Sequence, residues 1–181
     1  MGGVSGLRKK DLNLPEGPFR LEVKELAETV RTIYARKGLS DIFDILSEAA
    51  LLIRKPLVTD ELSGFTTYID EEFIVFLNSR FTLGHERFTG AHELYHLTYN
   101  ADILKRETII PDDEKYKSED EKANIFAAEL LMPEDYVKEV FYKIVNVDKD
   151  SVLPRHIIRM HNFFKVSYKA MLKRLIQLDL C

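Results

Sequence analysis

The segment from His92 to His96, which reads H-E-x-x-H, constrains the fold more than any other feature of this sequence. On an α-helix, residues four apart lie on one face with Cβ atoms about 5 to 6 Å apart. Both imidazoles then reach a single zinc ion at roughly 2.0 to 2.1 Å. Glu93 follows the first histidine, where the general base of a zinc hydrolase belongs. The motif therefore predicts a helix that carries two metal ligands and a base.

A catalytic zinc ion usually has three protein ligands, so a third one is needed on a later element. The acidic start of the next predicted helix offers Glu119, Asp120 and Glu121. A ligand and a side chain four residues later share a helical face, and the later side chain can orient a ligating imidazole. That spacing pairs Asp120 with Asn124 but pairs Glu121 with Ile125, which cannot form a hydrogen bond. Spacing favours Asp120 as the third ligand, with Glu121 as the alternative.

Composition limits the remaining possibilities. The 181 residues suit one compact domain or one domain with a small appendage, and a net charge of -4 gives no bulk electrostatic reason to expect nucleic-acid binding. The longest apolar runs are too short to span a bilayer. Cys181, the last residue, is the only cysteine, so any metal must be held by His, Asp and Glu. The first six residues lack a secretory core, so a cytoplasmic protein is expected.

Hydrophobic periodicity and turn residues predict several helices and a small sheet. Two segments rich in aromatic and β-branched residues, 65–69 and 73–77, indicate a β-hairpin. Segment 73–77 is either an edge strand that pairs with an extended peptide or a central strand. The polar stretch 100–118 predicts no regular element. Helices are expected near residues 19–37, 41–50, 82–99, 119–131 and 134–145, with a further pair flanking 165–167.

Two segments, residues 87–96 and 123–133, resemble the ImmA/IrrE family of zinc metallopeptidases. The likeness is strongest over residues 64–133 and returns in the tail, over 161–180. It implies an α+β fold with a zincin-like metallopeptidase core, made of N-terminal helices, a small β-sheet, the H-E-x-x-H helix and a following ligand helix. The expected organisation is a flexible leader at 1–18, a zinc metallopeptidase domain at 19–133 and an all-helical subdomain at 134–181.

The resemblance also implies roles for individual residues. His92 and His96 are expected to bind one zinc ion per chain, Glu93 to be the catalytic acid/base, and Asn124 to support a carboxylate ligand on the next helix. Members of the family typically cleave or otherwise inactivate helix-turn-helix repressors. A regulatory endopeptidase that acts on a repressor or antitoxin-like protein is therefore the leading hypothesis. The alternative is a non-proteolytic metal-binding regulator that inactivates a repressor by binding it.

The sequence departs from the usual family pattern at two positions. The ligand position, commonly Glu, is Asp120 here with Glu121 beside it, and the usual small residue between the histidines is Tyr95. Either change points to weaker metal binding or a narrower cleft. The donor that stabilises the oxyanion is left unassigned among four candidates: Tyr95, Tyr99, His156 and His161.

Overall fold

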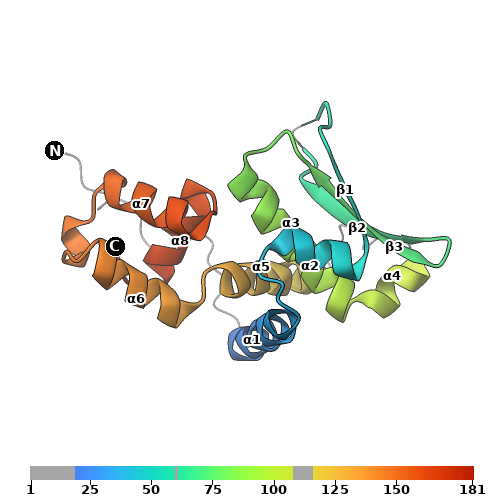
Figure 1. Cartoon of the computed structure of the whole chain (residues 1–181), viewed down its shortest axis with the longest axis horizontal. Coiled ribbons are helices and arrows are strands. Elements are labelled where there is room, and N and C mark those ends of the chain that lie inside the picture. The colour runs from blue at the N-terminus through green and yellow to red at the C-terminus, as the bar shows by residue number, and fades with distance from the viewer. Residues whose placement is uncertain (1–18, 60, 108–115) are drawn as a thin grey trace.

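The computed structural model describes residues 19–59, 61–107 and 116–181, so the leader predicted at 1–18 lies outside the described residues. Within that part, the fold is a mixed α+β arrangement, as predicted (Figure 1). The elements in chain order are α1 (Arg20–Arg36), α2 (Ile42–Ala49), β1 (Leu51–Lys55), β2 (Gly64–Ile69), β3 (Glu72–Asn78), α3 (Leu83–Tyr99), α4 (Ala101–Glu107), α5 (Lys117–Leu131), α6 (Glu134–Ile144), a 3₁₀ turn (Lys149–Ser151), α7 (Pro154–Phe164) and α8 (Tyr168–Gln177).

The three strands form one sheet in the order β1-β3-β2. β2 and β3 make the predicted antiparallel hairpin, whose turn residues Asp70 and Glu71 both have positive φ angles, as tight hairpin turns require. β1 pairs with β3 in parallel. Of the two alternatives for segment 73–77, the central strand is therefore right and the edge strand is wrong. Val75 and Leu77 in β3 are fully buried, which explains the apolar run.

Helix α3 lies between the sheet and helix α5, and this position buries it on nearly every side. Its N-cap is Thr82, whose side chain accepts a hydrogen bond from the backbone N–H of His85. Arg54 of β1 forms a bidentate ion pair with Glu86, with N–O distances of 2.7 and 2.9 Å. Arg87 pairs with Asp41, which caps α2. The helix that carries the H-E-x-x-H motif is thus fixed by charged contacts as well as by packing.

The polar stretch at 100–118 contains helix α4, which the sequence did not predict. Asn100 ends α3, and its backbone carbonyl accepts hydrogen bonds from Ile103 and Leu104, so a new helix starts at once. Leu104 is fully buried, but α4 has no other buried side chain. A single apolar anchor produces no helical periodicity, which is why the pattern missed this element.

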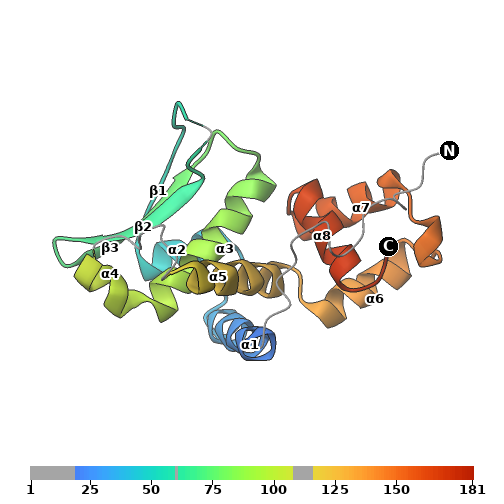
Figure 2. The same ribbon diagram turned by 180° about the vertical axis from the view of Figure 1, so that it is seen from behind.

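The buried apolar residues in the described ranges form two clusters. The first joins α1, α2, β3, α3 and α5, and the second joins α6, α7 and α8. Both views show α5 between the sheet and the C-terminal helices, and its last residues pack into the second cluster (Figures 1 and 2). No helix in the described ranges is both long and apolar enough to cross a membrane.

A buried arginine joins the C-terminal helices to α5. Arg174 of α8 donates to Oε2 of Glu129 over 2.6 Å, to the backbone carbonyl of Met132 over 3.0 Å and to Gln177 over 2.7 Å. Both members of the ion pair are at least 98% buried. The C-terminal helices also approach α3. Gly84 in the first turn of α3 lies so close to the α7–α8 connection that an added Cβ would be 2.4 Å from a backbone atom of Val166.

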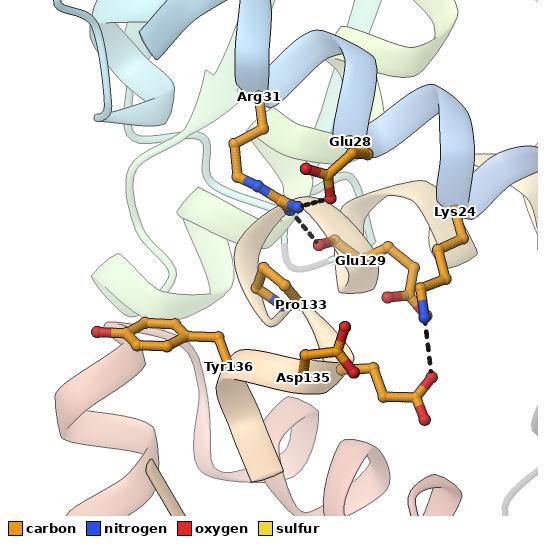
Figure 3. A pocket seen from close by; sticks show the side chains of 8 residues that line it. Lys24, Glu28, Arg31, Glu129, Pro133, Asp135 and Tyr136 are labelled. Atoms are coloured by element: carbon orange, nitrogen blue, oxygen red, sulfur yellow. Dashed lines mark hydrogen bonds and ion pairs between the residues drawn. The ribbon is translucent and has the colours of Figure 1, made fainter. Parts of the chain in front are cut away.

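Helix α1 contacts the end of α5 and the start of α6 (Figure 3). Lys24 forms an ion pair with Glu134 at the start of α6, over 3.2 Å, and Arg31 donates to the backbone carbonyl of Glu129 over 3.3 Å. These side chains line a pocket between α1 and the α5–α6 connection. The end of α5 is therefore held from α1, α6 and α8 together.

Replacing Arg174 by Met should destabilise the protein by about 3 kcal/mol, because Glu129 then stays buried without its main partner. This is the low end of the usual range for a broken buried pair, since Arg20 lies 4.0 Å from the same carboxylate. Urea denaturation measures the loss. Lys173→Met, which removes the same charge from the neighbouring position, is the control and should change stability by no more than about 0.5 kcal/mol. Equal effects of the two substitutions would contradict a stabilising role for the buried Arg174–Glu129 ion pair.

Candidate metal centre

Two helices bring together three side chains that could hold a metal ion. His92 and His96 lie one turn apart on α3, and Asp120 comes from the first turn of α5. Their donor atoms all lie within 4.8 Å of one another. The two Nε2 atoms are 3.1 Å apart, and Oδ1 of Asp120 is 3.5 Å from Nε2 of His92 and 3.4 Å from Nε2 of His96.

These distances fit tetrahedral coordination. Ligand bonds of roughly 2.0 to 2.2 Å at tetrahedral angles place neighbouring donor atoms about 3.4 Å apart. The three measured separations lie close to that value, so the three atoms occupy one face of a tetrahedron and leave the fourth corner open. Of the two carboxylates that the sequence left open, Asp120 is the one that reaches both imidazoles. Glu121, the next residue on α5, does not belong to the group.

Each histidine has an amide partner on its other ring nitrogen. Nδ1 of His92 lies 3.2 Å from Oδ1 of Asn124, and Nδ1 of His96 lies 2.9 Å from Oδ1 of Asn100. An amide oxygen only accepts, so in the neutral ring each Nδ1 carries the proton and each Nε2 presents a lone pair to the shared position. Asn124 was predicted, whereas Asn100 was missed. The same four-residue spacing, counted from His96, would have identified it.

Glu93 is buried beside the sheet rather than exposed on the helix. Its carboxylate Oε2 accepts a hydrogen bond from Oγ1 of Thr66 in strand β2, over 2.8 Å. Both side chains are at least 94% buried. Thr66 therefore fixes the rotamer of the predicted base, a role that the sequence did not reveal because β2 lies 27 residues away along the chain.

Glu119, which precedes the proposed ligand, has a separate environment. Its carboxylate accepts hydrogen bonds from the Tyr95 hydroxyl over 3.1 Å, from Nδ2 of Asn100 over 2.8 Å and from Lys122 over 2.7 Å. Tyr95 was one of four candidates for the oxyanion donor. Its hydroxyl instead donates to Glu119, so the tyrosine between the two histidines belongs to this hydrogen-bond network.

The charges around the group shift the pKa values of its members in opposite directions. When the imidazoles of the metal-free protein carry protons on both ring nitrogens, their Nε2–H groups donate to Asp120 and hold its pKa well below its usual range, against the opposing effect of burial. Burial lowers the pKa of His92, but the hydrogen bond to Asp120 and the charges of Glu93 and Asp120 outweigh it and raise the pKa overall. Burial also opposes ionisation of Glu119, yet hydrogen bonds from Lys122, Asn100 and Tyr95 lower its pKa.

Comparison with known proteins identifies the family. The model of the peptidase M78 family, described as the IrrE N-terminal-like domain, matches residues 46–176. The chain belongs to this family. The predicted ImmA/IrrE relationship is confirmed, and the family indicates a metallopeptidase-type function.

Similarity beyond the family is distant. A solved structure described as a Mycobacterium tuberculosis transcriptional regulator is 16% identical, with a TM-score of 0.47. The match covers 92% of this chain and 44% of that chain, so this chain spans less than half the length of the regulator. A search of curated proteins finds no match.

Metal titration of two alanine variants distinguishes the two carboxylates. The wild-type chain should bind one zinc ion, and Asp120→Ala should bind it at least about 10-fold more weakly, because a loss of that size is typical even for a partner outside the ligand set. Glu121→Ala should bind zinc as the wild type does. Metal analysis after dialysis, together with chelator competition, measures both. Weaker zinc binding by Glu121→Ala than by Asp120→Ala would make Glu121 the ligand.

The metal-free protein should show a pH window set by His92 and Asp120. Because the pKa of His92 is raised, its contribution to stability is complete below 6.5 and is lost as the pH rises through the folded-state value. Because the pKa of Asp120 is lowered, its contribution is present above 3.8 and is lost as the pH falls through the folded-state value. The stability advantage of wild type over Asp120→Asn should therefore be greatest between these two values. Urea unfolding with excess chelator measures it, and an equal advantage at about pH 5 and about pH 9 would contradict the pairing.

Proposed function

We propose that this chain is a zinc-dependent regulatory endopeptidase in which His92, His96 and Asp120 bind one zinc ion and Glu93 is the catalytic acid/base. The observation that carries the proposal is the set of three donor atoms spaced 3.1 to 3.5 Å apart, with a buried carboxylate from the same helix beside them. Two nitrogen donors, one oxygen donor and an open position are the ligand set of many zinc hydrolases.

The chemistry follows from these positions. When bound, zinc supplies Lewis acidity, which acidifies a water molecule and polarises the scissile carbonyl. Glu93 is the residue that would accept a proton from a water molecule at the open position and deliver it to the leaving nitrogen. Thr66 keeps the Glu93 carboxylate in place through its 2.8 Å hydrogen bond. The hydrogen-bond network of Tyr95 and Glu119 connects through Asn100 to Nδ1 of His96, the ring nitrogen that faces away from the proposed metal position.

The proposed substrate-binding edge is strand β2. Because β3 is central, the edges of the sheet are β1 and β2. Of these two edges in the described part of the chain, β2 is the one with a side chain, that of Thr66, hydrogen-bonded to Glu93. An extended peptide that paired with β2 would run beside the base, in the mode by which many proteins bind unfolded segments. This strand replaces segment 73–77 as the expected site of peptide binding.

The substrate class is proposed from the family resemblance. Helix-turn-helix repressors or antitoxin-like proteins are the expected targets, and a net charge of -4 fits a protein substrate better than direct contact with nucleic acid. The peptidase unit is proposed to cover residues 19–133, in a zincin-like arrangement, with residues 134–181 as a helical subdomain. The two apolar clusters support that division.

Glu93→Gln should reduce peptide cleavage by about 10² to 10⁴-fold, because the amide cannot accept the proton. Zinc content and urea stability should stay close to wild type, since the ligands and the size of the side chain are unchanged. Cleavage of labelled casein and of purified helix-turn-helix repressors is the readout. Cleavage that persists refutes Glu93 as the base. Undiminished derepression in cells without cleavage would favour the non-proteolytic regulator.

A further inference from the structure

The two histidines of the proposed metal centre are supported very differently. His92 contacts Asn124, an exposed side chain for which no further hydrogen bond is found among the described residues. His96 contacts Asn100, which is 95% buried and donates its Nδ2 to Glu119 over 2.8 Å. A chain of two hydrogen bonds therefore runs from the imidazole of His96 to the carboxylate of Glu119.

The two hydrogen bonds between His96, Asn100 and Glu119 can run in only one self-consistent direction. A carboxylate accepts hydrogen bonds and donates none, so Asn100 must turn its NH₂ group toward Glu119. Its carbonyl oxygen then faces His96 and accepts a hydrogen bond from Nδ1–H. With the proton on Nδ1, the lone pair of His96 is on Nε2, which faces His92 and Asp120 at 3.1 and 3.4 Å. The opposite amide orientation would put the proton on Nε2 and block that position.

We propose that Glu119 is a positioning residue, which acts through the amide of Asn100 to hold His96 in the tautomer that binds metal. The inference rests on the metal centre of the proposed function but not on peptide cleavage. Glu119 touches neither ligand nor base, so its effect is on how readily His96 offers Nε2. Partners of this kind typically change metal affinity by about 10- to 100-fold.

The position of Glu119 is itself fixed from two further sides. Lys122 donates to Oε1 over 2.7 Å, and the Tyr95 hydroxyl donates to Oε2 over 3.1 Å. Tyr95 is 97% buried, and its ring packs against those of Tyr99 and Phe126. The tyrosine that departs from the family pattern thus has a role here: it adds a buried donor that holds the carboxylate.

A simpler account makes Glu119 an acidic residue that stabilises the start of α5 through the helix dipole. Its oxygens, however, bond to three side chains, which come from α3, from the residue that ends α3 and from α5 itself. A dipole effect would change stability without changing the proton position on His96. The two accounts therefore differ in the tautomer of His96 and in metal affinity.

The test compares Glu119→Gln with the matched control Glu139→Gln, an exposed glutamate that also pairs with a lysine. The amide introduced by Glu119→Gln both donates and accepts, so Asn100 can adopt either orientation. Long-range ¹H–¹⁵N NMR of the metal-free chain, at a pH above the histidine titration, should show Nδ1–H on His96 in wild type and control and a mixture of tautomers in Glu119→Gln. Zinc affinity from chelator competition should fall about 10-fold in Glu119→Gln alone. Wild-type tautomer and affinity in Glu119→Gln would overturn the proposal.

A double variant makes the test independent of folding losses. Adding Asn100→Asp to Glu119→Gln restores an acceptor beside His96 and a donor beside that acceptor, so the Nδ1–H tautomer and the zinc affinity should recover. Recovery of the tautomer and the zinc affinity supports the proposed path from Glu119 through Asn100 to His96, which we call the relay. A zinc affinity no better than that of Glu119→Gln contradicts the relay. Peptidase activity is scored separately. A relay that controls zinc binding in a chain without cleavage would overturn the proposed function alone, and cleavage with an unaffected tautomer would overturn only the relay.

Discussion

The packing of α3 against α5 is the contact on which the rest of the molecule depends. Both helices belong to the first apolar cluster, α3 through residues that include Ala91, Leu94 and Leu97, and α5 through residues that include Ala123, Phe126 and Ala127. Small residues at Ala91, Ala123 and Ala127 let the two backbones approach closely. Only that approach allows the short side chain of Asp120 to reach two imidazoles on the neighbouring helix, at 3.4 and 3.5 Å.

Buried polar groups on and around these two helices form hydrogen bonds between elements. Asn100, Thr66 and Glu129 each join two elements by a hydrogen bond of 2.6 to 2.8 Å. At the start of α5, Glu119 accepts from Asn100, which contacts the proposed ligand His96. At the other end of α5, the Glu129–Arg174 pair fixes the helix to the C-terminal cluster. The helix that carries the third ligand is held at both ends, which keeps the ligand atoms in a geometry close to the one that metal binding requires.

Local spacing was enough to predict much of the centre. The four-residue repeat that pairs His92 with His96 also selected Asp120 through Asn124, because each pair lies on one face of a single helix. Helix α3 was predicted from the H-E-x-x-H motif itself, and the β2–β3 hairpin from its aromatic and β-branched residues. Helix α4 was missed because only one of its side chains is buried.

Contacts between distant segments could not be read from the sequence. Thr66 reaches Glu93 only because β2 packs on α3, and the order β1-β3-β2 depends on a parallel pairing that no local pattern signals. Glu119 was one of three carboxylates at the start of the predicted helix, and spacing gave it no partner. Its three side-chain partners come from α3, its end and α5, so its role appears only when both helices are in place.

X-ray absorption spectroscopy of the zinc-loaded chain tests the central claim most directly, since it reports the ligands without reference to any substrate. The proposed centre predicts two imidazole nitrogens at about 2.0 to 2.1 Å and two oxygens at about 2.0 to 2.2 Å, one from Asp120 and one from water. The Asp120→Ala variant should lose one oxygen or the metal itself. A spectrum with fewer than two imidazoles, or one unchanged by Asp120→Ala, would contradict a zinc centre built from these two helices.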